Sequence, residues 1–294
     1  MFFEEMVKEA ITRIRKFAVI ARAYGFEIAV GFSGGKDSQV VYDLMKRARV
    51  EFKAYYNESF ESNTTKKFIK EYYPEVVWRK DHKFGFIQNI SVNHNGLLPT
   101  KEIAYCCADY KHNPKYVDEC SVVGVRRAES NVRKNRTTIS YKNKRTATKM
   151  KSETSRYFRD SCQSVGTASI IQLLPIVDWT DEDVWNYIKV RNLPINPEYR
   201  YSNRIGCIVC PKANFKKNYN SLMKYPKLID AFIRVKESNP DTNYVITSDN
   251  MDYANDKVYY ICRWLNRSFL PFTKKDEKLY KQIKARYEEI HTKV

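Results

Sequence analysis

The chain has 294 residues, of which 43% are hydrophobic and 14% are aromatic. This length and composition exclude an intrinsically disordered chain and indicate one large domain or two modest ones. No apolar run reaches the roughly 18–20 residues of a membrane helix. The charged N-terminal segment also lacks the apolar core of a secretory signal, so we expect a soluble, cytoplasmic protein without a membrane partner.

The charge is strongly basic, with 52 Lys and Arg against 34 Asp and Glu, a net of +18. More than half of this excess lies in residues 126–159, where twelve basic and two acidic side chains give a net of +10. Such a concentration predicts a polyanionic partner, either nucleotide phosphates, sulfate or nucleic acid. A solvated basic loop is the alternative, because charge alone does not identify a ligand.

Helix and strand patterns alternate over the first 180 residues, which is typical of a parallel sheet with crossover helices. Residues 4–23 carry apolar side chains at helical spacing. The pattern continues with strands at 27–32, 52–56, 76–78, 121–125 and 170–177, and helices at 36–47, 64–73 and 101–111.

Within this part, residues 130–155 show no periodicity and predict a long basic loop. Thr180 and Asp183 then form a capping-box pattern that predicts the start of a helix. Further helical patterns cover residues 219–237, 256–266 and 274–291. We therefore predict an α/β nucleotide-binding domain with a Rossmann-like parallel sheet over residues 1–180. A mainly helical C-terminal region is predicted over residues 181–294.

The segment Ser33-Gly34-Gly35-Lys36-Asp37-Ser38 joins a predicted strand directly to a predicted helix. Glycines let the backbone approach an anion, and the unpaired amides of a helix N-terminus point at it. Lys36 would add a positive charge, Ser33 and Ser38 would add hydroxyl donors, and Asp37 could contact magnesium or cap the helix. The segment differs from a Walker A loop because only three residues separate Gly31 from Gly35, and because Asp37 stands where Ser or Thr should follow the lysine. An ordinary strand–helix turn is the alternative.

A second candidate anion site is the sequence Val123-Gly-Val-Arg-Arg-Ala-Glu-Ser-Asn-Val-Arg133, which follows another predicted strand. Arginine suits the capture of sulfate or phosphate because its guanidinium can donate two parallel hydrogen bonds. Surface arginines that merely precede the basic loop are the alternative.

Seven cysteines in a chain without a secretory signal favour metal or redox chemistry over a disulfide framework. Cys106 and Cys107 are adjacent, and Cys207 and Cys210 form a Cys-x-x-Cys pair. Four thiolates can hold zinc or a [4Fe–4S] cluster. An adjacent Cys-Cys pair fits a zinc site poorly, and thiols without a metal are the third alternative.

The loop SGGKDS resembles the PP-loop of the adenine nucleotide alpha hydrolase group, which acts at the α-phosphate of an adenine nucleotide on a Rossmann-like domain. Within this group the chain resembles, over about residues 27–235, the family that reduces phosphoadenosine phosphosulfate (PAPS) or adenosine phosphosulfate (APS). That family binds the phosphosulfate end of its substrate through a G-x-R-R-x-x-S-x-x-R run. The residues that match this run are Gly124, Arg126, Arg127, Ser130 and Arg133.

The resemblance extends to the iron–sulfur branch of the family, which carries Cys-Cys on a helix and Cys-x-x-Cys after the sheet. The matching residues are Cys106, Cys107, Cys207 and Cys210. The chain also departs from the family. The reductases have a C-terminal E-C-G-x-H segment whose cysteine attacks sulfur, whereas this sequence has no cysteine after Cys262. The segment YYNESFESN lacks the glycine and proline that are usual there, which puts the adenosine contacts in doubt.

The resemblance implies an enzyme that binds an adenine nucleotide and handles sulfur, with Lys36, Asp37 and Arg127 as candidate catalytic residues. We favour sulfur transfer to a nucleic acid with ATP and Mg²⁺, in which a [4Fe–4S] cluster holds or delivers the sulfur. The basic segment 126–159 would bind the acceptor, and a further protein would donate sulfur or electrons. A reductase or sulfotransferase acting on PAPS or APS is the first alternative, and a non-catalytic nucleotide- or DNA-binding regulator is the second.

Overall fold

The computed structural model describes residues 3–80, 83–111, 119–141, 162–164, 171–238, 256–266 and 273–292. The chain divides into two compact units, each with its own hydrophobic core. Unit 1 comprises Met1–Glu58, Asn63–Lys80 and His112–Ile205, and unit 2 comprises Ser59–Ser62, Asp81–Lys111 and Gly206–Val294.

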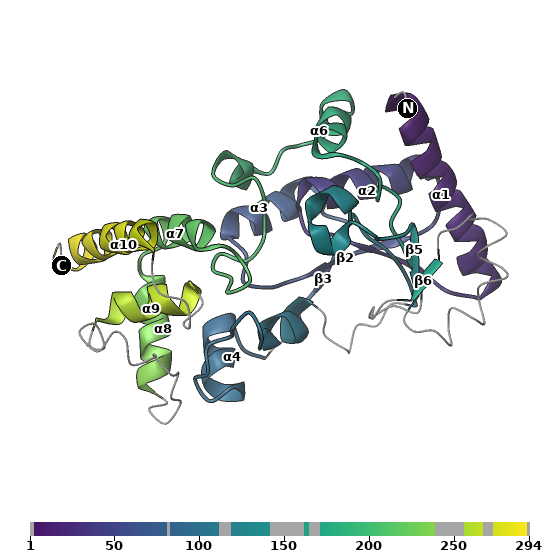
Figure 1. Ribbon diagram of the computed structural model, residues 1–294. Helices are drawn as coiled ribbons and strands as arrows, with labels where there is room; N and C mark the ends of the chain where they lie inside the picture. The colour runs from purple at the N-terminus through teal and green to yellow at the C-terminus, as the bar shows by residue number, and fades with distance from the viewer. Residues whose placement is uncertain are drawn as a thin grey trace. The chain divides into compact units, whose positions relative to one another are not determined.

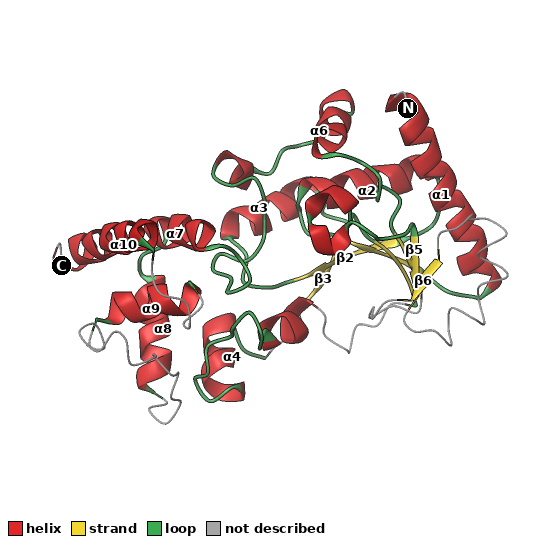
Figure 2. Ribbon diagram, viewed as in Figure 1, coloured by secondary structure: helices red, strands yellow, loops and turns green. Residues whose placement is uncertain are grey.

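Unit 1 is built on a sheet, whose strands are yellow in Figure 2. Among the described residues the strand order is β3-β2-β1-β4-β7-β5-β6. Neighbouring strands from β3 to β7 pair in parallel, whereas β5 runs antiparallel to β7. The predicted α/β class is confirmed, and the antiparallel pairing of β5 is an addition to it. The strands are β1 (Ile28–Gly31), β2 (Lys53–Asn57), β3 (Val77–Arg79), β4 (Cys120–Val122), β5 (Ile139–Tyr141), β6 (Cys162–Ser164) and β7 (Ile171–Leu173).

The strand order places a topological switch point between β1 and β4. From β1 the chain goes outward to β2 and β3 on one side and then returns to β4 on the other. In such sheets ligands bind outside the carboxyl ends of the two strands where the order reverses. The loop that follows Gly31 and the loop that follows Val122 therefore begin at the same edge of the sheet.

Four α-helices accompany this sheet in the described part of unit 1. Helices α1 and α6 both contact α2 (Figure 1). Val7, Ile14 and Phe17 lie on one side of α1 at helical spacing and are buried, as its amphipathic pattern predicts. Thr180 caps α6 in the predicted capping box with Asp183. The helices are α1 (Phe3–Ala23), α2 (Lys36–Ala48), α3 (Asn63–Tyr72) and α6 (Asp181–Val190), with short helical turns η2 (Arg127–Glu129), η3 (Asn131–Arg133) and η4 (Pro197–Arg200).

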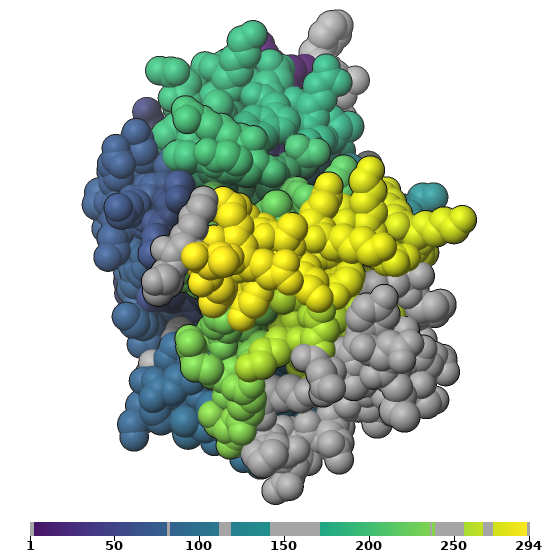
Figure 3. All heavy atoms as spheres, turned by 90° about the vertical axis from the view of Figure 1, so that its left-hand side faces the viewer, coloured from purple at the N-terminus to yellow at the C-terminus, as the bar shows by residue number. Residues whose placement is uncertain are grey.

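Unit 2 is helical throughout its described regular elements. Helix α9 is buried from Val258 to Leu265, whereas α10 lies at the surface of the unit and buries Tyr280 and Ile283 (Figure 3). This agrees with the predicted helical C-terminal region. The elements are α4 (Phe86–Asn93), η1 (Cys107–Lys111), α7 (Phe215–Lys224), α8 (Leu228–Glu237), α9 (Lys257–Leu265) and α10 (Lys274–Thr292). Within the described residues, no helix has both the length and the apolar character needed to cross a membrane.

The division into units differs from the boundary that the sequence suggests near residue 180. That boundary falls inside unit 1, because α6 packs against α2. The Tyr187 hydroxyl donates a hydrogen bond to Asp43 at 2.6 Å, and the Arg191 guanidinium pairs with the same carboxylate at 2.9 Å. Unit 2 also takes residues 59–62 and 81–111 from the N-terminal part of the chain.

Three predicted elements differ in the structure. The expected loop at 130–155 contains η3 and β5, because Ile139 and Tyr141 are fully buried in the core; its residues from 142 onward lie outside the described part. The expected helix at 219–237 is two helices with Pro226 between them, since proline lacks the amide that a helix interior needs. The expected helix at 101–111 begins only at residue 105 and continues into η1, and Ile103 instead donates its amide to the Thr100 hydroxyl in a local turn.

Candidate functional site

The loop between β1 and α2 depends on Gly34, which has a φ of +69°. Side chains other than glycine are strained in this left-handed region. A Cβ atom at this position would also lie 2.9 Å from Cγ1 of Ile69 on α3. Both facts explain why the predicted PP-loop needs a glycine here. The short distance to Ile69 also shows that the loop packs closely against α3.

Hydroxyl groups hold the loop in a closed turn. The backbone N–H of Ser33 donates to the Ser38 hydroxyl at 3.1 Å, and that hydroxyl donates to the Gly35 carbonyl at 2.8 Å. The Gly35 N–H is 3.4 Å from the Ser33 hydroxyl oxygen. Gly35 itself is the N-cap of α2 and has no side chain with which to cap it. The N-cap residue therefore gives no side-chain partner to the first amides of α2.

A distant segment of unit 1 also holds this loop. The Asn196 side chain is fully buried, and its amide donates to the Gly34 carbonyl at 3.1 Å. Gln39 donates to the same carbonyl at 3.1 Å. The Tyr199 hydroxyl accepts a hydrogen bond of 2.7 Å from the backbone N–H of Lys36. Residues 196–199 thus fix both the peptide after Gly34 and the first amide of α2.

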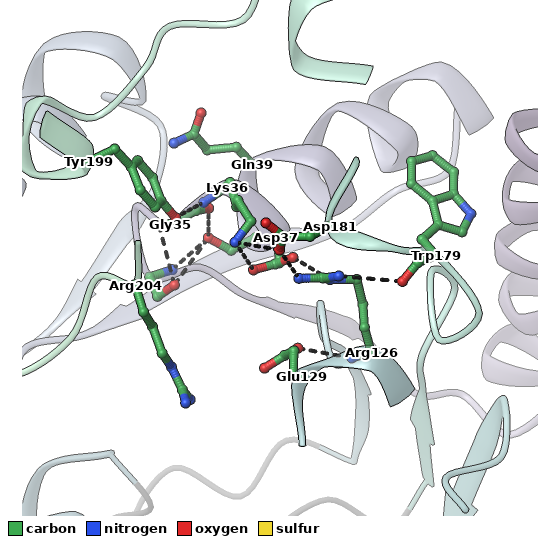
Figure 4. Close-up of polar contacts among 12 residues, drawn as sticks. Gly35, Lys36, Asp37, Gln39, Arg126, Glu129, Trp179, Asp181, Tyr199 and Arg204 are labelled. Atoms are coloured by element: carbon green, nitrogen blue, oxygen red, sulfur yellow. Dashed lines mark hydrogen bonds and ion pairs between the residues drawn. The ribbon is translucent and has the colours of Figure 1, made fainter. Parts of the chain in front are cut away.

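Lys36, Asp37, Arg126 and Asp181 form one cluster of alternating charges, in which the side chains point toward one another (Figure 4). Arg126 is only 2% exposed. Its Nε lies 2.6 Å from Asp37 Oδ1, and its Nη2 lies 2.9 Å from Asp181 Oδ1. The buried Lys36 ammonium also reaches Asp181, at 3.0 Å. Two buried cations are therefore balanced by two carboxylates.

The environment moves the pKa values of the two carboxylates in opposite directions. Burial raises the pKa of Asp37 and outweighs the opposing effects of Arg126 and Lys36. Burial also acts on Asp181, but the hydrogen bond and charge of Lys36, with those of Arg126, hold the pKa of this more exposed carboxyl below its usual value. Asp181 is therefore firmly ionised, whereas Asp37 is easier to protonate than an ordinary aspartate.

Gly124 lets the loop after β4 approach the first turn of α2. A Cβ atom here would lie 2.7 Å from the Asp37 carbonyl oxygen and 2.8 Å from its carbonyl carbon. Because both neighbours are backbone atoms, no side-chain rotation could relieve the clash. This glycine therefore fixes how closely the predicted arginine segment and the PP-loop meet.

A cavity of about 240 Å³ opens where these two loops meet. Its position agrees with the switch point between β1 and β4. Of the predicted residues it is lined by Ser33, Gly35, Lys36, Asp37, Ser38, Gly124 and Arg133, and in addition by Gly31, Val123, Val125, Glu129, Tyr199, Arg204 and Ile205.

The three arginines of the predicted motif lie in three different environments. Arg126 lies in the buried charge cluster, and Arg133 lines the cavity and pairs with Glu129. Arg127 instead pairs with Asp178 and donates to the Arg136 carbonyl at 2.7 Å. Neither Arg127 nor Ser130 is among the residues that line the cavity.

Asp181, Asn196, Tyr199 and Arg204 belong to the site, although sequence reasoning assigned none of them to it. Asp181 lies in the first turn of α6, where an acidic residue is already explained by its favourable interaction with the helix N-terminus. Arg204 lies within residues 27–235, over which the sequence resembles the family. No spacing rule connects Asn196 or Tyr199 to the PP-loop, so only family conservation could have indicated them.

The predicted cysteine pairs both lie in unit 2. Asn218 is fully buried and clamps the Cys-x-x-Cys turn: its oxygen accepts from the Cys210 N–H and its amide donates to the Cys210 carbonyl, both at 3.0 Å. Lys217 donates to the Cys207 carbonyl at 2.7 Å. The hydrogen bond with Cys107 and burial raise the pKa of Cys106, and the charges of Cys207 and Cys210 add to this effect.

The four thiols are therefore close enough to interact electrostatically, and their chemistry suits a soft metal or an iron–sulfur cluster. Within the described residues, however, no three or more His, Cys, Asp or Glu side chains are gathered tightly enough to hold a metal ion.

Comparison with protein families identifies residues 27–213 as a phosphoadenosine phosphosulfate reductase domain. The chain belongs to this family. Adenosine 5′-phosphosulfate reductase 2 of Bacillus subtilis is 25% identical over 71% of this chain and 83% of its own length. Sulfate adenylyltransferase subunit 2 of Bacteroides thetaiotaomicron is 26% identical over 68% of each chain.

An uncharacterized protein of Methanocaldococcus jannaschii is 26% identical over 87% of this chain, which spans 56% of the length of that relative. Among solved structures, the phosphate complex of the PAPS reductase from Candida auris is 13% identical, with a TM-score of 0.36. That match covers 66% of this chain and 87% of the other.

Proposed function

We propose that unit 1 binds an adenine nucleotide with its acidic chain in the cavity, and that the protein is an enzyme of sulfur chemistry acting at the α-phosphate. The observation that carries this proposal is that the PP-loop and the loop containing Gly124 line the same cavity. Lys36, Arg133 and Arg204 supply positive charges to its lining. Oriented amides and cations at a helix N-terminus suit a phosphate or phosphosulfate group. The membership of the PAPS reductase family supports an enzyme of sulfur chemistry. The similarity to an APS reductase and to a sulfate adenylyltransferase subunit supports the same class of enzyme.

ATP is the nucleotide that we propose first. An acceptor oxygen would attack the α-phosphorus, the bond to the β-phosphate oxygen would break, and pyrophosphate would leave. A sulfur nucleophile would then displace AMP from the adenylated acceptor. Lys36 is placed to stabilise the charge that develops on the phosphate chain. Asp37 is the cavity carboxylate of the PP-loop and would share Mg²⁺ with the ligand, since Mg²⁺ in phosphate sites uses one or two carboxylates together with substrate phosphates.

The cysteines of unit 2 would hold the sulfur-handling group. We assign Cys106, Cys107, Cys207 and Cys210 to a [4Fe–4S] cluster, with zinc as the alternative. The resemblance of these four cysteines to those of the iron–sulfur branch supports this assignment. When bound, a cluster would supply sulfur- or electron-transfer chemistry, and a donor protein would be needed to renew it.

A nucleic acid is the acceptor that we propose, with the basic segment 126–159 as its binding region. Residues 142–159 lie outside the described part, so the support is the charge of the sequence. Neutralising the lysines and arginines between 142 and 159 should weaken RNA and DNA binding and flatten its salt dependence. Unchanged binding would contradict this role for the segment.

Reduction of APS or PAPS, or sulfo-group transfer from them, is the second candidate. The APS reductase relatives and the arginine run favour it. The test is the thermal stability of anaerobically purified protein with ATP, APS or PAPS, each with Mg²⁺. A ligand at about 100 times its Kd stabilises by roughly 2.7 kcal/mol.

Stabilisation by ATP together with pyrophosphate release would support the thiolation enzyme. Preferential stabilisation by APS or PAPS would support the second candidate. Nucleotide binding without any turnover would instead favour a non-catalytic regulator, and no stabilisation by any of the three would contradict the proposal.

A further inference from the structure

The hydroxyl of Tyr199 occupies a position between the PP-loop and the cavity. It accepts the hydrogen bond from the Lys36 N–H, and it lies within 3.4 Å of the position that a Cβ on Gly35 would take. Its ring lies edge-on to Trp185, with centroids 5.0 Å apart, which holds the ring in place. The residue also lines the cavity.

A tyrosine hydroxyl can accept hydrogen bonds and donate one at the same time. Tyr199 uses its acceptor capacity on Lys36, and within the described residues its own proton has no recorded acceptor. Burial raises the pKa of Tyr199, so this proton is retained at neutral pH. A ligand oxygen in the cavity would give the hydroxyl its missing acceptor.

Arg204 differs from the other cations of the cavity. Lys36 pairs with Asp181, and Arg133 pairs with Glu129. The exposed Arg204 guanidinium has no recorded ion pair within the described part of the chain, and Figure 4 draws its side chain extending from the loop without a polar contact. Its positive charge is therefore available to an anion at the cavity.

We propose that Tyr199 and Arg204 bind the phosphate or phosphosulfate chain directly and form a wall of the anion site that is separate from the PP-loop. The proposal rests on the proposed function, because it assumes that the cavity receives the acidic chain of the ligand. A cavity of about 240 Å³ is smaller than the roughly 300–1,000 Å³ of pockets that enclose a whole small ligand. The cavity therefore suits the acidic chain better than a whole nucleotide, and inorganic pyrophosphate should bind without a nucleoside.

The test measures the Kd of ATP and of inorganic pyrophosphate by titration calorimetry. The variants are Tyr199→Phe and Arg204→Gln. Matched controls are Tyr201→Phe and Arg200→Gln, which change neighbouring exposed residues that do not line the cavity. Melting of each unliganded variant separates a loss of ligand contact from a loss of folding.

We expect Tyr199→Phe and Arg204→Gln each to weaken both ligands roughly tenfold, the value of one hydrogen bond to a charged group. Only Arg204→Gln should also reduce the salt dependence of binding. Unchanged or tighter binding by Tyr199→Phe would overturn the proposal. The hydroxyl would then only occupy the Lys36 N–H group as its hydrogen-bond acceptor and would not contact the ligand.

The outcomes also separate this proposal from the proposed function. Nucleotide binding by the wild type that neither variant affects overturns the inference alone. Pyrophosphate binding that both variants weaken, with no added affinity from the adenosine of ATP, supports the inference and contradicts the nucleotide function. Failure of the wild type to bind either ligand contradicts both.

Discussion

A Cβ atom on Gly124 would lie 2.7 Å from the carbonyl oxygen of Asp37, so the loop after β4 and the first turn of α2 meet backbone to backbone. No flexible side chain lies between them. The arginine segment and the PP-loop can share a cavity only because the chain has no side chain at this point.

Replacing Gly124 with alanine should therefore move the first turn of α2. We expect a loss of about 1–3 kcal/mol of unfolding free energy, as for other overpacked sites, together with weaker nucleotide binding. Denaturant unfolding and ATP titration measure the two effects. The control is Gly85→Ala, because no atom lies within 4 Å of a Cβ there. Equal stability of the two variants would contradict the prediction, because the backbone at Asp37 would then accommodate a Cβ at position 124 without a loss of stability.

Lys36 should contribute directly to nucleotide affinity. Lys36→Met removes a buried ammonium beside the cavity, and we expect ATP to bind roughly ten- to one-hundredfold more weakly. Lys46→Met is the matched control, since Lys46 lies on the same helix and pairs with Glu75 at the surface. Titration of ATP into both variants is the measurement, and similar affinities would remove Lys36 from the site.

Asp181 should compete with the ligand for Lys36, which it contacts at 3.0 Å. Asp181→Asn removes that competing charge, and we expect ATP to bind about two- to fivefold more tightly, the scale of an exposed ion pair. Glu182→Gln removes one negative charge from the same turn of α6 and serves as the control. Weaker binding by Asp181→Asn would instead show that Asp181 positions Lys36 and Arg126 for the ligand.

Glu75 should make the stability of unit 1 sensitive to acid. Hydrogen bonds from Lys46 and Tyr42 lower the pKa of Glu75 from 4.5 to about 2. The folded state therefore favours the ionised carboxyl. This stabilisation is complete above pH 4.5 and is lost as the pH falls toward 2. Thermal melting across this range should show a shallower loss for Glu75→Gln than for wild type, with Glu27→Gln as an exposed carboxylate control. Parallel curves would contradict the prediction.

The cysteine assignment predicts iron and acid-labile sulfide in anaerobically purified protein. Cys207→Ser with Cys210→Ser should lose both, because half of the thiol ligands would be absent. Cys120→Ala, in the core of unit 1, should retain them. Metal and sulfide analysis distinguishes the alternatives: zinc without sulfide would favour a zinc site, and a wild type without metal would contradict both.

Local patterns were sufficient for much of unit 1. The turn that joins β1 to α2, the capping box at Thr180 and the position of β4 follow from neighbouring residues, because glycine conformation, capping and strand alternation are local properties. The same holds for the candidate site loops, which each continue directly from a strand. Pro226 shows the limit of periodicity, since one residue without an amide divided an otherwise continuous helical pattern.

The sequence by itself determined which chemical groups the protein has: the glycine-rich loop, Lys36, the arginines and the two cysteine pairs. Only the tertiary structure decided which of them meet. Tyr199 reaches Lys36 across 163 residues, and Asp181 reaches Arg126 across 55. Arg126 is buried in that cluster while the adjacent Arg127 pairs with Asp178. Such partnerships depend on strand order and helix packing, because no local pattern encodes contacts between segments so far apart in the chain.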